Sequence, residues 1–99
     1  DRKAWSDSIY HSYTSIVNSA KALLIADDVK TNTQAGIISQ FDELFVETGK
    51  IELSTSFKEF TYQLNEHEPS EEFAQKYIED ARLFLKRVDA YRTKEVQDV

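Results

Sequence analysis

The feature that most constrains the fold of this chain is the amphipathic stretch from Ser70 to Tyr91, SEEFAQKYIEDARLFLKRVDAY. Its apolar residues recur at spacings of three and four, which places them on one side of a helix, and charged residues take the other side. Pro69 and Ser70 provide a helix start, and Glu71 and Glu72 follow where the helix dipole favours carboxylates. Because such a stripe is unstable in water, the rest of the chain must cover it.

Three further helices are predicted before this stretch. The first spans residues 1–27 and ends at two aspartates, whose carboxylates are unfavourable at the negative end of the dipole. The second runs from Thr33 or Gln34 to Thr48, with Gly49 as its C-cap. Gly36 inside it is expected to permit close approach by another helix. The third begins near residues 54–56, where Ser56-Phe57-Lys58-Glu59 has the form of a capping box, and ends before the turn at residues 65–69.

This pattern predicts an all-α fold, an up-and-down four-helix bundle with short connections. The 99 residues suit one domain, 1–99, in which the tail at 92–99 lies beyond the apolar stripe and is expected to fray. The chain contains no methionine, so we expect it to be a piece of a longer protein.

Composition narrows the range of partners and compartments. The net charge of −6 argues against an exposed nucleic-acid groove, because nucleic-acid phosphates would be repelled. No apolar run approaches the roughly 20 residues that span a bilayer, so no membrane partner is expected. The chain has no cysteine, which excludes disulfides and thiolate metal sites and fits a cytoplasmic protein. Neither a metal nor a cofactor is expected.

The segment from Tyr10 to Lys50 resembles the HEPN family of small helical domains. The resemblance rests on AKALL at the end of the first helix, the polar KTNT loop and the second helix AGIISQFDELFVETGK. The last helix, with PSEEFA and YIEDARLFLKRVDAY, is similar to the last helix of that family. The pattern HSYTSIVNSAKALL also looks like HEPN domains at the C-terminal end of bacterial nitrite/sulfite reductase-like proteins. The resemblance implies a helical bundle that dimerises through its long helices.

Catalytic HEPN proteins are metal-independent ribonucleases, and they carry an arginine followed four to six residues later by a histidine near the junction of the last two helices. The arginines here are at positions 2, 82, 87 and 92 and the histidines at 11 and 67, and no pair has that order and spacing. Asn65 and His67 mark the degenerate form of the motif region. The domain alone is therefore expected not to be an enzyme, and no catalytic residue is predicted.

Three polar residues and a set of aromatic residues remain as candidates for binding. His11 and Tyr13, with Lys21 further along the same helix, could form a polar pocket for a ligand phosphate. A histidine that is hydrogen-bonded at a helix–helix or subunit seam is the simpler interpretation. Trp5, Tyr10 and Tyr13 exceed what one small bundle can bury, and they could line an interface.

We therefore predict a non-catalytic helical module for interaction and dimerisation, appended to a larger enzyme that could be a nitrite/sulfite reductase-like protein. Its expected partner is a second copy or the parent enzyme. A regulatory domain that binds a small ligand or nucleotide through His11, Tyr13 and Lys21 is the alternative. A degenerate HEPN ribonuclease is the third possibility.

Overall fold

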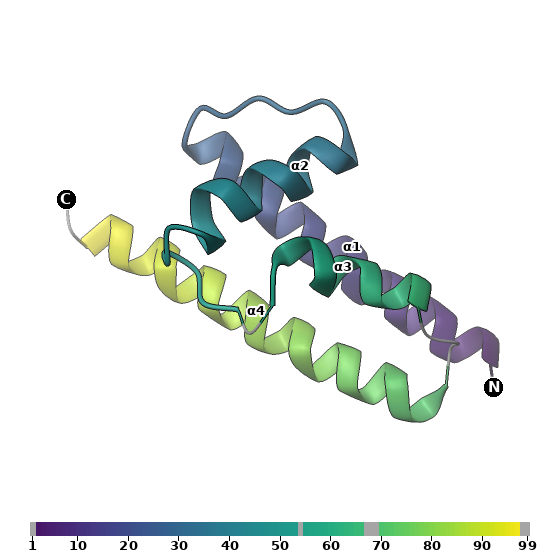
Figure 1. Ribbon diagram of the computed structural model, residues 1–99. Coiled ribbons are helices and arrows are strands. Elements are labelled where there is room, and N and C mark those ends of the chain that lie inside the picture. Colours follow the sequence, from purple (N-terminus) through teal and green to yellow (C-terminus); the bar gives the residue numbers. More distant parts are fainter. Residues whose placement is uncertain (1, 54, 67–69, 98–99) are drawn as a thin grey trace.

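The computed structural model describes the backbone of residues 2–53, 55–66 and 70–97, and the side chains of these residues except 2, 64–66 and 95–97. In this part of the chain we find four α-helices, a π-helical turn and no strand (Figure 1). The predicted all-α helical bundle is confirmed. The elements are α1 (Arg2–Ala26), α2 (Gln34–Phe41), η1 (Asp42–Val46), α3 (Phe57–Glu66) and α4 (Glu71–Gln97).

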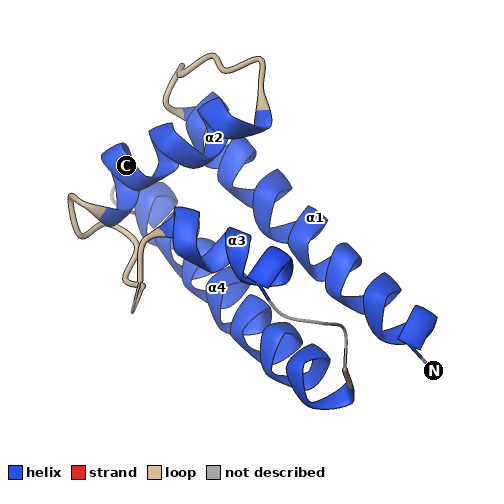
Figure 2. Cartoon of the chain, turned by 45° about the vertical axis from the view of Figure 1, so that its right-hand side comes forward, coloured by secondary structure: helices blue, strands red, loops and turns tan. Residues whose placement is uncertain are grey.

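The long helices α1 and α4 lie side by side and form the most extensive packing between two elements (Figures 1 and 2). Both begin at the same end of the molecule, although strict alternation of direction along four helices would make them antiparallel. The loop at residues 27–33 carries the chain back before α2 starts, which changes that alternation. Tyr13 lies close enough to Tyr77 to contribute to its raised pKa, and both residues are in the first halves of their helices, which fits this arrangement.

The helix ends follow the capping residues that the sequence predicts. Thr33 caps α2, and its Oγ1 accepts a hydrogen bond from the Gly36 amide at 3.0 Å. The Ser56 hydroxyl accepts from the Glu59 amide, and the Ser70 hydroxyl from the Phe73 amide, each at 3.1 Å. Gly49 has a φ of 78°, the left-handed conformation that ends the second helix.

Three local expectations need correction. The second helix is not α-helical throughout, because η1 replaces its last part with a π-helical turn. A Cβ atom on Gly36 would lie 3.0 Å from the Thr33 hydroxyl. The space at Gly36 is therefore limited by the capping residue of its own helix, and not by the close approach of another helix. The last helix continues to Gln97, well past Tyr91, where its apolar stripe ends.

The core is built largely from aromatic rings. Phe41 stacks on Phe45 with ring centroids 5.1 Å apart, and it also contacts Phe57 and Phe84 at 4.5 and 5.7 Å. Ala81 is buried in the middle of the stripe on α4, as the spacing predicts. Among the described helices, none combines the length and the apolar character that crossing a membrane would require.

Candidate functional site

The exposed side of α1 carries almost no charge along its middle. Between Ser8 and Ala20 the chain has no Asp, Glu, Lys or Arg, whereas 30% of the whole chain is charged. At 1.5 Å per residue, this stretch is about 20 Å long. Its solvent-facing side chains include Tyr10, His11, Ser15 and Asn18. We call this surface, from Ser8 to Ala20, the uncharged face of α1.

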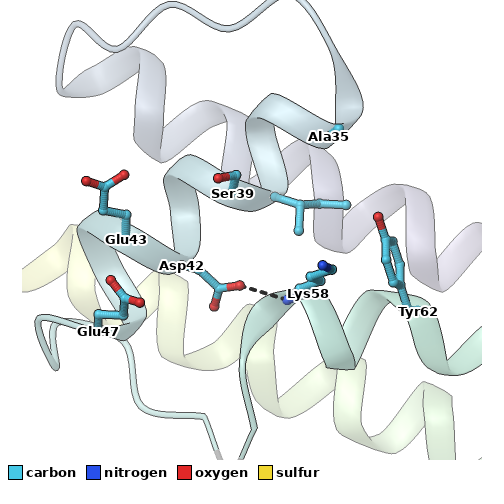
Figure 3. A pocket seen from close by; sticks show the side chains of 8 residues that line it. Ala35, Ser39, Asp42, Glu43, Glu47, Lys58 and Tyr62 are labelled. Carbon is cyan, nitrogen blue, oxygen red and sulfur yellow. Dashed lines mark hydrogen bonds between the residues drawn. The ribbon is translucent and has the colours of Figure 1, made fainter.

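Tyrosines from two helices gather at the uncharged face. Tyr10 is 65% exposed, and its ring centroid lies 6.4 Å from that of the half-buried Tyr13. From α3, Tyr62 is 39% exposed, and its hydroxyl points toward α1 in Figure 3. Burial raises the pKa of Tyr13, and the neighbouring Tyr62 and Tyr10 raise it further. Of the three aromatic residues expected to exceed the core, Tyr10 is exposed, whereas Trp5 and Tyr13 are partly buried against the core.

A fourth tyrosine lies beneath this group. Tyr77 of α4 is fully buried, and its hydroxyl has no hydrogen-bond partner among the described residues. Burial, and to a smaller extent the nearby Tyr13, raises the pKa of Tyr77 above its ordinary value. A buried hydroxyl without a partner costs free energy, so the seam between α1 and α4 contains a local weakness.

The three predicted ligand-binding residues do not form one pocket. His11 and Lys21 are both exposed, and they lie ten positions apart, or about 15 Å along the helix axis. Tyr13 is two residues from His11, so at about 100° per residue its side chain leaves the opposite side of the helix. No single small ligand contacts all three side chains in this arrangement.

The side chains of the degenerate motif region, Asn65 and His67, are not described by the structure. His67 is outside the described residues, and the side chain of Asn65 is not described. Among the described residues, no three His, Cys, Asp or Glu side chains gather in a way that could hold a metal ion.

A pocket of about 520 Å³ opens between the α2–η1 segment and α3 (Figure 3). Asp42 lies at its centre and caps α3, because its carboxylate accepts hydrogen bonds from the amides of Phe57 and Lys58. Glu43 and Glu47 stand on the far side of Asp42, away from Lys58. The Lys58 ammonium lies 5.9 Å from the centroid of the Tyr62 ring. The carboxylate of Asp42 is therefore committed to capping α3.

Sequence reasoning missed the absence of charge on α1, although the signal was available. The apolar stripe directs attention to the buried side of the helix, and the Ser/Thr-rich remainder looks like ordinary solvent-facing surface. The signal that distinguishes this segment from an ordinary surface is its lack of charged residues, compared with the high charge of the rest of the chain. Residues 31–41 also lack charge, but the large hydrophobic residues of that segment are buried.

Known proteins give one informative comparison. The chain is 30% identical over 95 residues to the Methanocaldococcus jannaschii protein named "Putative toxin MJ0605", and the alignment covers 89% of this chain and 71% of that protein. No family model matches the chain, and no solved structure matches it significantly. The alignment takes in nearly all of the helical domain. The chain therefore belongs to the same family as this protein from Methanocaldococcus jannaschii.

Proposed function

We propose that the chain is a toxin-like, non-catalytic helical module that pairs with a second copy of itself through the uncharged face of α1. The observation that carries this proposal is the exposure of Tyr10 and its neighbours on a surface without charged side chains. The centres of protein interfaces are depleted of charged residues and enriched in tyrosine. The name of the relative supports a toxin-like role for the module.

A second copy suits this face better than a partner of opposite charge. Two copies with a net charge of −6 each repel one another wherever their acidic surfaces meet. This repulsion is weakest at a surface without charge. A basic partner would instead be attracted to surfaces of the chain that carry carboxylates. Across a two-fold axis the same face contacts itself, so the tyrosines of one copy would meet those of the other. A stable dimer needs at least about 1,000 Å² of buried surface in total.

Sedimentation of the wild-type domain and two matched variants tests the pairing. We expect a dimer at high micromolar concentration, and Tyr10→Glu should dissociate it by placing two like charges at the seam. The control is Leu83→Glu, which adds the same charge at an exposed apolar residue of α4 and should leave the dimer intact. A wild-type monomer at that concentration would instead favour docking onto another protein.

Membership of the HEPN family is part of the proposal, and the all-α bundle supports it together with the motifs in the first, second and last helices. Metal-free cleavage of RNA needs a base and a cation within hydrogen-bond reach of each other. The three arginines of α4 follow His67 in the chain instead of preceding it, so the family's catalytic pair is not formed in its usual order. We expect no cleavage in a single-turnover assay with labelled RNA at low salt. Cleavage abolished by His67→Ala would establish the ribonuclease alternative.

The context of the module stays a prediction. The likeness to HEPN domains of nitrite/sulfite reductase-like proteins implies an attached redox enzyme, and the absence of cysteine fits the cytoplasm. Reading the gene on both sides of this segment would test both points, because an adjoining reductase domain or an export signal would be visible in its translation.

A further inference from the structure

A second pocket lies away from the tyrosine group, where residues 49–52 meet the later part of α4. Its volume is about 500 Å³. Three of the residues that line it are cationic (Lys50, Arg87 and Lys94), and the carboxylate of Glu52 is the only acidic group among its lining residues. A local excess of positive charge is notable in a chain with 12 basic and 18 acidic residues. We call this site the basic pocket.

Two of the three cations are held in place by neighbouring groups. The Arg87 guanidinium donates from Nη1 to the backbone carbonyl of Glu52 at 2.7 Å, which joins α4 to the loop. The Lys50 ammonium lies 5.6 Å from the centroid of the buried Phe45 ring, within the range of a cation–π contact. The pocket is therefore ordered by contacts that leave most of the N–H donors of Arg87 and Lys50 available to a ligand.

The helix dipole explains the position of Lys94 but not that of Arg87. Lys94 is in the last turn of α4, where the dipole favours a cation without any ligand. Arg87 is ten residues before the end of the helix at Gln97, beyond the reach of that effect. Residues 87, 90, 91 and 94 share one face of α4, so Arg87 and Lys94 both border the same space.

We propose that the basic pocket binds a small phosphate-bearing molecule. Three cations against one carboxylate leave an excess of two positive charges, which matches a phosphate monoester dianion. Arginine, with its planar fork of donors, is well suited to binding phosphate oxygens. The volume exceeds what one phosphate group fills, so there is space for the organic part of the molecule beside the half-buried Tyr91. The acidic balance of the whole chain disfavours a long polyanion such as RNA.

Calorimetric titration of the purified domain with AMP, inorganic phosphate and adenosine tests this site. AMP and phosphate should bind saturably, with affinity falling as ionic strength rises, and adenosine should not bind. Arg87→Gln should weaken binding about 10-fold because it removes a charge and hydrogen bonds. Lys94→Gln should weaken it about 3-fold by removing one exposed charge. Arg82→Gln is the matched control, since it makes the same change at an exposed arginine of α4 outside the pocket, and it should leave binding unchanged.

Loss of the bond from Arg87 to Glu52 could disturb the loop, so Lys94→Gln, which leaves that bond in place, must show weaker binding on its own. The proposal fails if adenosine binds as well as AMP, or if Arg82→Gln weakens binding as much as Arg87→Gln. It also fails if neither AMP nor phosphate binds saturably. The tyrosine group and the basic pocket share no residues, so failure here leaves the sedimentation test of pairing unaffected.

Discussion

The two long helices, α1 and α4, cover the same core but present very different surfaces to solvent. The outer side of α4 alternates acids and bases, as Glu79, Arg82, Lys86 and Asp89 illustrate, whereas the uncharged face of α1 has none from Ser8 to Ala20. Burial explains the inner stripes of both helices, but it does not explain this outer difference. A mixed charged surface keeps a helix soluble, while an uncharged surface with exposed tyrosine is typical of an interface.

The largest expected effect concerns the seam that the two helices share. Ala81 is 3% exposed in the stripe of α4, on the helix that packs most extensively against α1. Ala81→Arg would bury a charge and overpack this seam, and it should lower the free energy of unfolding by about 3–5 kcal/mol. Urea denaturation measures the loss. A variant within about 0.5 kcal/mol of wild type would contradict the buried position of Ala81 on α4.

A second prediction concerns Tyr77, whose buried hydroxyl lacks a partner among the described residues. Tyr77→Phe removes the unpaired group while keeping the ring, so at pH 7 the variant should be between equal to wild type and about 1 kcal/mol more stable. Equilibrium unfolding in urea provides the comparison. A loss of more than about 1 kcal/mol would mean that the hydroxyl has a partner, such as an ordered water molecule.

The same residue predicts how stability depends on pH. Because burial raises the pKa of Tyr77 in the folded state, its hydroxyl keeps the proton after the unfolded chain begins to lose it near pH 10. The contribution of this protonated hydroxyl to the free energy of unfolding is complete below about pH 10. It is lost as the pH rises further, with a slope of up to about 1.4 kcal/mol per pH unit. Urea titrations at pH 8 and 11 should therefore show a larger loss for wild type than for Tyr77→Phe. Equal losses would show that Tyr77 titrates normally.

Substitutions on the solvent-facing sides of α1 and α4, where the two helices differ most in charge, should have the smallest effect on the free energy of unfolding. Asn18→Glu on α1 and Thr93→Glu on α4 each add one carboxylate at an exposed polar residue. Both should change the free energy of unfolding of the monomer by no more than about 0.5 kcal/mol. Only Asn18→Glu should weaken self-association, because it places like charges at the seam. Sedimentation at several concentrations separates the two variants, and equal weakening by both would point to general repulsion.

Much of the fold could be predicted because it depends on local rules. The capping roles of Thr33, Ser56 and Ser70 and the left-handed turn at Gly49 each involve residues only a few positions apart. The stripe on α4 likewise determines its own buried side. Such features follow from helix periodicity and hydrogen-bonding chemistry, which a single sequence displays directly.

The features that escaped prediction depend on contacts between distant residues. Asp42 caps a helix that begins 15 residues later, and the π-helical turn that follows Phe41 could not be anticipated from local propensity. The basic pocket depends on a hydrogen bond from Arg87 to the backbone carbonyl of Glu52, and these two residues are 35 positions apart in the sequence. The proposed binding role of His11 with Lys21 assumed that their presence on one helix would bring them together. Their separation along its axis prevents this.

Cross-linking of single-cysteine variants tests the central claim most directly, since the natural chain has no cysteine to interfere. Asn18→Cys lies on the uncharged face of α1, and Lys86→Cys lies on the charged outer side of α4. With a short bifunctional thiol reagent at high micromolar protein concentration, the account predicts a cross-linked dimer from Asn18→Cys and little from Lys86→Cys. Equal cross-linking of the two variants, or efficient cross-linking only through position 86, would contradict pairing through α1.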